Sequence, residues 1–273
     1  MKCTLIGHPL GHSLSPDIHT KLFALSGVTG EYDLTDIPKE LLEEKVEYLK
    51  TLDGFNITIP YKTDIIPYLS SLDETAKRYG AVNCVSVKDG KMTGYNTDCI
   101  GFIRSLEMGG LSLSGKVLLL GCGGVGRMMA CEFLLHGADL TVAVLPEEIP
   151  MAEKVVSSMK NSENAKVISL SDISGEFDLC ANATPVGMFP KVDVSPVSEE
   201  VVSSCKAFFD VIYNPTETKL MKMFEKEGKK AVGGMAMLVY QAVAAHEIWY
   251  GAKFDENDIN SIISQMNEKI KNN

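Results

Sequence analysis

Three glycines at fixed spacing form the segment whose chemistry is easiest to recognise. Gly121, Gly123 and Gly126 match G-x-G-x-x-G, directly after an apolar run at 116–120 and at the start of a helical pattern. In that context the first glycine permits a tight turn, the second lets the backbone approach a pyrophosphate, and the third lets helix and strand pack closely. Free amides at the helix N-terminus would then face the phosphates. The pattern predicts a dinucleotide site, although glycine-rich strand-to-helix turns also occur without a ligand.

Four segments of the first hundred residues combine polar side chains that core packing does not require. Each places a hydroxyl, amide, amine or carboxylate at a strand end or before a helix: 7–16 with Ser13 and Ser15, 55–62 with Asn56, Thr58 and Lys62, 80–83 with Asn83, and 94–98 with Thr97 and Asp98. Ligands of open α/β sheets bind outside the carboxyl ends of strands, so the segments predict a small-ligand site. Taken singly, Lys62 could be a surface lysine, Asn83 a turn residue and Asp98 a helix N-cap.

The two serines of the first segment favour an anionic ligand. Ser13 and Ser15 lie just before an expected helix at 15–26, with Pro16 at its first helical position. The dipole and unpaired amides of that helix would help to hold a carboxylate. In the alternative interpretation, which is the commoner situation for such a pair, Ser15 is the N-cap and Ser13 is only a loop hydroxyl.

Strand-like apolar runs alternate with helical patterns along the chain, which predicts an α/β fold with a mainly parallel sheet in each half. In the first half we expect strands at 2–7, 31–37, 54–59, 83–87 and 91–95, and helices at 15–26, 38–52 and 98–108. Asp89-Gly90, between the last two strands, favours a two-residue hairpin. The first sheet should therefore be mixed, as part of a mainly parallel α/β/α domain.

The second half is expected to form a doubly wound dinucleotide-binding domain of the Rossmann type. Its expected strands are 116–120, 141–145, 166–170, 177–181, 207–212 and 230–232. We place the substrate-binding domain at 1–108 and the dinucleotide-binding domain at 109–234, with a hinge at Gly109-Gly110-Leu111-Ser112. The helical residues 235–273 are expected to pack back on the first domain.

Composition narrows the class of protein. The chain has 273 residues, 45% of them hydrophobic and 23% charged, and a formal net charge of -10. Such a composition is that of a folded globular protein. The negative charge argues against nucleic acid as a partner, and the lack of a long apolar run argues against a membrane segment. We expect a cytoplasmic protein that is a monomer or a homodimer.

Cysteine and histidine patterns suggest neither disulfides nor a metal. The seven cysteines are an odd number without a C-x-x-C pair, which fits reduced and mostly buried thiols. His8, His12 and His19 lie near one another in sequence, but they lack nearby carboxylate ligands. We therefore expect no metal site.

Taken together, the segments resemble the shikimate dehydrogenase family over nearly the whole chain. The resemblance is carried by eight motifs in family order: His12-Ser13-Leu14-Ser15-Pro16, Asn56-Ile57-Thr58-Ile59-Pro60-Tyr61-Lys62, Gly80-Ala81-Val82-Asn83, Asn96-Thr97-Asp98, Gly121-Cys122-Gly123-Gly124-Val125-Gly126-Arg127, Asn182-Ala183-Thr184-Pro185-Val186-Gly187-Met188, Asp210-Val211-Ile212-Tyr213-Asn214-Pro215 and Met237-Leu238-Val239-Tyr240-Gln241-Ala242. Any one of them could arise by chance, whereas eight in order are hard to explain otherwise.

The resemblance implies reversible, nicotinamide-dependent reduction of 3-dehydroshikimate to shikimate, on the way to chorismate and the aromatic amino acids. By matching positions, it implies that Lys62 and Asp98 are the catalytic pair. The other substrate-binding residues that it implies are Ser13 and Ser15 for the carboxylate, Tyr213 near that end, and Thr58, Asn83 and Gln241 for the ring hydroxyls. The expected cofactor-binding residues are Gly121, Gly123, Gly124, Gly126, Arg127, Thr184, Met188 and Gly234.

The residue types fit that chemistry. Hydride addition to a carbonyl creates an alkoxide, which needs a proton and local positive charge, and a lysine beside an acid supplies both. Two alternatives remain: a dehydrogenase of mixed quinate and shikimate specificity, and a non-catalytic dinucleotide-binding sensor. The presence of both Lys62 and Asp98 weighs against the sensor.

The sequence departs from the family at Thr20, where asparagine is common, at His246, where an aromatic residue is usual, and at the cofactor. The family mostly uses NADP, and its usual Asn-Arg-Thr is replaced by a segment containing Glu147 and Glu148. No lysine or arginine lies between Arg127 and Lys154. A carboxylate there would repel a 2′-phosphate and could accept a hydrogen bond from a 2′-hydroxyl.

This departure predicts NAD or a relaxed preference. In the alternative, both glutamates are solvated, and Arg127 or a later loop residue binds the 2′-phosphate.

Overall fold

The computed structural model describes residues 1–11 and 13–272, which divide into two units. The first unit contains Met1–Gly101 and Val239–Met266, and the second contains Phe102–Leu238 with the last residues of the chain. The division falls within three helices, α5 (Asp98–Met108), α10 (Met235–Tyr250) and α11 (Glu256–Lys271), rather than at the glycine pair Gly109-Gly110. The domain boundaries that the sequence suggests therefore stay a prediction.

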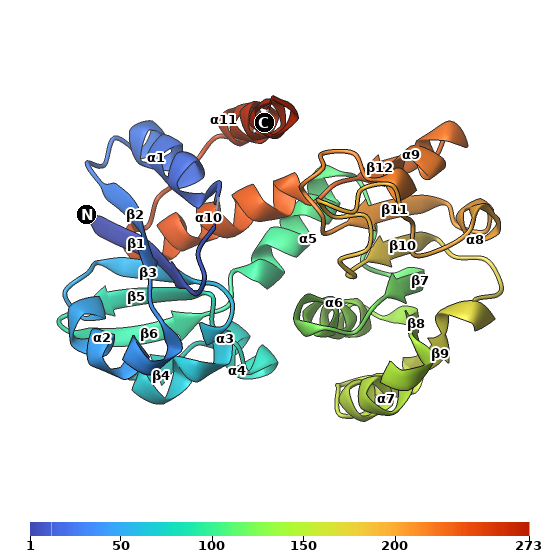
Figure 1. Cartoon of the computed structure of the whole chain (residues 1–273), viewed down its shortest axis with the longest axis horizontal. Coiled ribbons are helices and arrows are strands. Elements are labelled where there is room, and N and C mark those ends of the chain that lie inside the picture. Colours follow the sequence, from blue (N-terminus) through green and yellow to red (C-terminus); the bar gives the residue numbers. More distant parts are fainter. Residues whose placement is uncertain (12, 273) are drawn as a thin grey trace. The chain divides into compact units, whose positions relative to one another are not determined.

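The first unit is built on a mixed six-stranded sheet of order β2-β1-β3-β5-β6-β4 (Figure 1). Its strands are β1 (Lys2–Gly7), β2 (Glu31–Asp36), β3 (Gly54–Ile57), β4 (Ser71–Leu72), β5 (Cys84–Lys88) and β6 (Lys91–Tyr95). Its shorter helices are α1 (Ser15–Ser26), η1 (Lys39–Leu41), α2 (Leu42–Leu49), α3 (Tyr61–Asp64), η2 (Ile66–Tyr68) and α4 (Glu74–Tyr79), and α11 (Glu256–Lys271) follows α10. Strand β1 pairs in parallel with β2 and β3, whereas β5 is antiparallel to both β3 and β6.

The hairpin between β5 and β6 explains the antiparallel part of this sheet. Asp89 and Gly90 both adopt positive φ angles, of 52° and 70°, as a two-residue hairpin turn of this kind requires. The predicted hairpin and the predicted mixed sheet are both confirmed.

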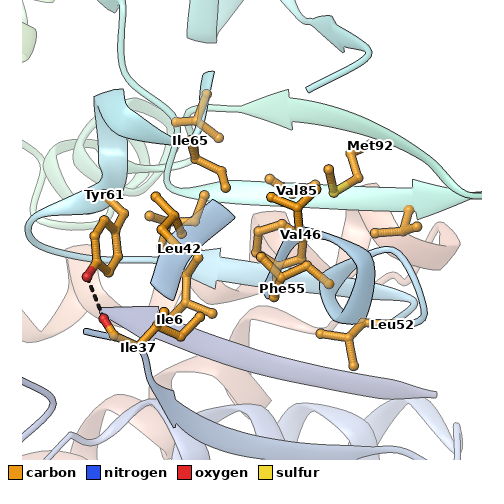
Figure 2. Close-up of a cluster of buried hydrophobic side chains, with 14 of the residues drawn as sticks. Ile6, Ile37, Leu42, Val46, Leu52, Phe55, Tyr61, Ile65, Val85 and Met92 are labelled. Carbon is orange, nitrogen blue, oxygen red and sulfur yellow. Dashed lines mark hydrogen bonds between the residues drawn. The ribbon is translucent and has the colours of Figure 1, made fainter. Parts of the chain in front are cut away.

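Side chains that alternate along the strands cover the two faces of the sheet. One face carries a core of Ile6, Phe55, Val85 and Met92 packed against Leu42 and Val46 of α2 (Figure 2). The other face carries a core that includes Cys3, Leu5, Phe23, Tyr32, Cys84, Ala245 and Trp249. Because the strand period is 2, this alternation buries both faces and yields an α/β/α arrangement.

The later part of α10 is closely fitted to the first sheet. The Trp249 indole N–H donates to the Val85 carbonyl at 2.9 Å. A Cβ at Gly54 would lie 2.3 Å from the Trp249 Nε1, so the close approach of β3 to this ring requires glycine. Residues Val239–Met266 belong to the first unit, and α10 packs on its sheet through Trp249.

The second unit has a fully parallel sheet of order β12-β11-β10-β7-β8-β9. Its strands are β7 (Gly115–Leu120), β8 (Ala138–Val144), β9 (Ala165–Ser169), β10 (Leu179–Asn182), β11 (Ala207–Asp210) and β12 (Lys230–Val232). Its helices are α6 (Gly124–Leu135), η3 (Pro146–Glu148), α7 (Ile149–Ser157), η4 (Ser162–Asn164), η5 (Leu170–Asp172), α8 (Glu199–Ser203) and α9 (Lys219–Lys226). Counted from β7, this order is the 3-2-1-4-5-6 of the Rossmann fold, so the predicted fold class is confirmed.

Aromatic side chains cover both faces of the second sheet. On one face Phe208 stacks on Phe224 of α9 with ring centroids 4.7 Å apart. Elsewhere in the unit Phe102 of α5 makes edge contacts with Phe133 of α6 and with Phe209, at 5.4 and 5.3 Å. Alternate residues of β11 thus enter different aromatic clusters, as expected for a strand covered by helices on both sides.

The structure corrects two local predictions. Helix α1 has Leu14 as its N-cap, without a side-chain cap, and Ser15 is the first helical residue, so the predicted capping role of Ser15 is wrong. The predicted helix at 38–52 is instead the short η1 followed by α2, which ends at Leu49. None of the seven cysteines, all of which lie within the described residues, forms a disulfide, and all except Cys131 are buried. In the part of the chain that the structure describes, no helix is long and apolar enough to span a bilayer.

A pair of buried histidines joins α1 to α10. The Nδ1 of His19 lies 2.9 Å from the Nε2 of His246, whose Nδ1 shares a hydrogen bond with the Tyr250 hydroxyl. Burial lowers the pKa of His246 to about 3. Burial, with a smaller effect of His246, also lowers the pKa of His19 well below its usual value. Both rings are therefore neutral in the folded chain at neutral pH.

We predict that this pair makes the fold sensitive to acid. Unfolded histidines titrate near pH 6.5, so the stabilising effect of a lowered folded pKa is complete above that value and is lost as the pH falls. His246→Phe keeps a buried ring but removes one titrating group. Between pH 7 and pH 5 the unfolding free energy should fall by about 2 kcal/mol more in the wild type than in the variant. Urea denaturation at both pH values measures this difference, and equal losses would contradict the prediction.

Candidate functional site

The topology of the first sheet gathers the four polar segments at one edge. Strands β1 and β3 are parallel neighbours, so the segments that follow them leave from the same edge. Strand β5 runs the other way, and its first residue, Cys84, pairs with both Asn56 and Tyr95. Asn83, just before β5, and Asn96–Asp98, just after β6, therefore lie at that edge too.

Lys62 and Asp98 form a direct ion pair at this edge. The Lys62 Nζ lies 2.6 Å from the Asp98 Oδ2, and the two side chains are 31% and 17% exposed. Lys62 is in the short helix α3, shortly after the end of the strand that the sequence predicts at 54–59. Asp98 is the first residue of α5. A carboxylate in the first turn of a helix also interacts favourably with the helix dipole. The pair thus combines a held ammonium with partial access to solvent.

Asn83 connects this pair to the rest of the edge. Its side-chain amide donates to the Asp98 Oδ1 at 2.8 Å and to the Thr97 hydroxyl at 3.0 Å. Its Oδ1 accepts a hydrogen bond from the Thr97 backbone amide at 2.6 Å. Because Asn83 is only 3% exposed, these bonds fix its carboxamide in one orientation.

The loop that carries the two serines is held at both ends. Ser13 Oγ accepts a hydrogen bond from the Ser15 amide at 3.2 Å, and Ser15 is buried. At the start of the loop, Asp36 binds the His8 ring at 2.6 Å and the Leu10 amide at 2.8 Å. Those two hydrogen bonds, the one from His8 first, lower the pKa of Asp36. The sequence analysis did not single out Asp36, although an acidic residue at the carboxyl end of an expected strand is a usable signal. His12, which belongs to the same segment of the sequence, lies outside the described residues.

Three further predicted substrate residues lie in different places. Thr58 follows β3, and a Cβ at Gly7 would lie 2.6 Å from its methyl group, so glycine is needed where the ends of β1 and β3 meet. Gln241 is buried on the part of α10 that belongs to the first unit. Tyr213 belongs to the second unit, after β11, and is 36% exposed.

The glycine loop of the second unit has the shape that phosphate binding needs. Gly121 has a φ of +87°, and a Cβ at Gly126 would lie 2.5 Å from the Gly121 carbonyl oxygen. A Cβ at Gly123 or Gly124 would meet nothing within 4 Å. The turn and the tight packing therefore depend on the first and third glycines, whereas the N-terminus of α6 is open for a ligand.

Polar side chains brace the loops that follow β10 and β11. Asn182 Oδ1 accepts from the Thr184 amide and hydroxyl at 3.0 and 2.7 Å, while Asn182 Nδ2 donates to the Asp210 Oδ1 at 3.1 Å. Asp210 also accepts from the Thr218 hydroxyl at 2.8 Å. Burial raises the pKa of Asp210 to about 6, against the opposing effect of its hydrogen bonds. Met188, in the first of these loops, is 46% exposed, and Gly234 leaves no room for a Cβ against the Val211 carbonyl.

The end of β8 carries the unusual acidic segment. Glu148 Oε2 accepts a weak hydrogen bond from the Leu145 amide at 3.3 Å. The Arg127 guanidinium contacts the Cys122 carbonyl at 3.4 Å and the Met151 sulfur at 3.7 Å, and its side chain is exposed. Arg127 thus lies between the glycine loop and α7 and stays accessible to solvent.

Comparisons with known proteins identify one family. The family model for the shikimate dehydrogenase substrate binding domain matches residues 5–85. A shikimate dehydrogenase (NADP(+)) of Clostridium perfringens is 39% identical over 96% of this chain and 97% of that protein.

Solved structures match over the full length of the chain. The chorismate mutase/shikimate 5-dehydrogenase fusion protein from Clostridium acetobutylicum is 36% identical, with a TM-score of 0.90 over 99% of this chain and 98% of that one. Shikimate 5-dehydrogenase from Listeria monocytogenes, solved in complex with shikimate and NAD, is 29% identical, with a TM-score of 0.85 over 96% of each chain. The chain therefore belongs to the shikimate dehydrogenase family.

Proposed function

We propose that this chain catalyses the reversible, nicotinamide-dependent reduction of 3-dehydroshikimate to shikimate. The observation that carries the proposal is the Lys62–Asp98 pair, joined at 2.6 Å at the strand edge where the polar segments meet. The names of the relatives support the choice of substrate. The open N-terminus of α6 beside Gly121 and Gly126 supports the binding of a dinucleotide.

The residues of the first unit supply what the reaction needs apart from hydride. The bound nicotinamide would supply hydride to the carbonyl carbon of the substrate. Lys62 would donate a proton to the oxygen on which negative charge develops. Before the proton is transferred, its ammonium would stabilise that charge. Asp98 accepts a hydrogen bond from Lys62 and so directs the ammonium, while its other oxygen is held by Asn83.

The remaining predicted substrate residues would bind and orient. Ser13 and Ser15, at the start of α1, suit a carboxylate, because hydroxyl donors and a helix N-terminus both favour negative charge. Thr58, Asn83 and Gln241 would contact the ring hydroxyls or support the groups that do, and Tyr213 is the residue that the family resemblance assigns to the carboxylate end. A dehydrogenase that also accepts quinate would differ mainly in how it treats the extra hydroxyl.

The test of the function is turnover by the wild type and by Lys62→Ala, with shikimate and quinate as substrates. We expect shikimate oxidation in the wild type and a loss of more than tenfold in kcat in the variant, because the proton donor is absent. Thermal stability should fall only moderately, because Lys62 is partly exposed and Asp98 keeps its hydrogen bond from Asn83. Lys39→Ala removes a more exposed lysine, paired with Asp64 at 3.6 Å, and should keep full activity. Retention of more than a tenth of kcat in Lys62→Ala would remove Lys62 from this role.

Replacement of a serine should affect binding rather than chemistry. Ser13→Ala should raise the KM for shikimate more than it lowers kcat, because the carboxylate is remote from the reacting carbon. Steady-state kinetics over a range of shikimate concentrations separate the two effects. A loss confined to kcat would show that Ser13 acts in the chemical step instead.

We further propose that the chain uses NAD well, with a preference for NAD or a relaxed choice between NAD and NADP. The relative from Clostridium perfringens carries NADP(+) in its name, so this proposal rests on the residues that follow β8. Glu147 lies where a cation would serve a 2′-phosphate, and the neighbouring Glu148 is bonded to the Leu145 amide. Arg127, which is exposed, is the cation of the alternative interpretation.

Comparison of kcat/KM for the two cofactors tests this choice. We expect no preference for NADP above about tenfold in the wild type. Glu147→Arg should shift the ratio toward NADP by about tenfold or more, because it replaces repulsion of the 2′-phosphate by attraction. Glu153→Arg makes the same change of charge at an exposed position on α7 and should leave the ratio nearly unchanged. A wild type that prefers NADP more than tenfold would overturn the proposal.

A further inference from the structure

Hydrogen bonds link β2 to the Lys62–Asp98 pair by way of Asn83, which takes part through its backbone carbonyl and, separately, through its side-chain amide. The Tyr32 hydroxyl donates to the Asn56 Oδ1 at 2.8 Å, and the Asn56 side-chain amide donates to the Asn83 carbonyl at 3.2 Å. Asn83 in turn donates to Asp98 at 2.8 Å. Tyr32 was not recognised from the sequence, because it lies on an expected strand at a position that only the fold connects to the site.

Tyr32 is held rigidly at the far end of these hydrogen bonds. It is 7% exposed, and the His19 ring stacks on it with a centroid distance of 3.8 Å and an interplanar angle of 5°. Burial raises the pKa of Tyr32 well above its usual value, so the phenol stays protonated. Because the Asn56 Oδ1 is an acceptor, the Tyr32 hydroxyl is the donor in the hydrogen bond between them. The ring and its proton are therefore both fixed.

The bond from Tyr32 decides which way the Asn56 carboxamide points. A carboxamide has one accepting and one donating end, and the Tyr32 hydroxyl selects the accepting end. The donating end is then directed at the Asn83 carbonyl. Without the hydroxyl, the Asn56 Oδ1 would be a buried acceptor without this donor. Rotation of the carboxamide would then remove one of the two hydrogen bonds to the Asn83 backbone carbonyl, which also accepts from the Ile57 amide at 2.9 Å.

We propose that Tyr32 and Asn56 are positioning residues for the reaction, and that they act by fixing Asn83 and through it the carboxylate of Asp98. They would set the direction in which Asp98 holds the Lys62 ammonium, without themselves touching substrate. Shifts of about 1 Å in a catalytic group can cost two orders of magnitude in rate, so such a residue is measurable in turnover. The proposal rests on the proposed dehydrogenase function.

The first experiment compares Tyr32→Phe with the wild type in shikimate oxidation. We expect kcat to fall about tenfold and KM to change less than kcat, while the ring and its packing remain. Thr4→Val is the matched control. Thr4 is buried on β1, and its hydroxyl bonds to the Asp33 carbonyl and the Thr35 hydroxyl of β2 rather than to Tyr32, Asn56 or Asn83. The control should keep kcat within twofold of the wild type. An equal loss in Thr4→Val would mean general loosening of the sheet and would overturn the proposal.

The decisive measurement places Tyr32→Phe on an Asp98→Asn background. If Tyr32 acts through Asp98, the second change should lower kcat by less than twofold there, so that the two effects are not additive. The same tenfold loss on both backgrounds, or a kcat within twofold of the wild type for Tyr32→Phe alone, would overturn the proposal. A wild type without turnover of shikimate would instead refute the proposed function, so the two failures are distinguishable.

Discussion

The reversed strand β5 is the constraint on which the candidate site depends. In a fully parallel sheet Asn83, which precedes its strand, would lie at the opposite edge from Thr58 and Lys62. Because β5 is antiparallel to β3 and β6, the residue before it lies where β3 and β6 end. Its carboxamide can then bond both Thr97 and Asp98, and Asp98 can bond Lys62. The turn at Asp89-Gly90 then returns β6 in the direction of β3, so that Asp98 lies at the same end of the sheet as Lys62.

In both units an asparagine side chain holds an aspartate, but the surroundings of the two aspartates differ. In each, an asparagine amide donates to an aspartate from the next segment: Asn83 to Asp98 and Asn182 to Asp210. Asp210 is fully buried, and its donors, from Ile212, Thr218 and Asn182, are all neutral, so its charge is costly and burial raises its pKa to about 6. Asp98 is partly exposed and forms an ion pair with Lys62 at 2.6 Å. The Asn182–Asp210 arrangement braces loops, whereas the Asn83–Asp98 arrangement is the one that we propose for proton transfer.

Local patterns predicted the strands, the hairpin and the two sheets because each depends on periodicity or on a turn that a few neighbouring residues determine. The capping role of Ser15 was predicted wrongly. The helix begins at Ser15 itself, and the Ser15 backbone amide donates a hydrogen bond to the Ser13 hydroxyl oxygen. Tyr32 and Asp210 were missed for another reason. Their roles depend on which strand lies beside which, and this cross-strand register is not encoded in any short stretch of sequence.

The end of β8 shows why family membership and cofactor preference are separate questions. The fold needs Gly121 and Gly126 in this region, since their close approach leaves no space for a Cβ. It places no such demand on Glu147, which follows the strand in an exposed turn. Glu148 has a local explanation, because its carboxylate accepts from the Leu145 amide at the start of a helix, where negative charge is favoured in any case. Under the proposal made above, the charge that would bear on a 2′-phosphate is that of Glu147, with the accessible guanidinium of Arg127 as the alternative, and the sheet that defines the family requires neither of these exposed side chains.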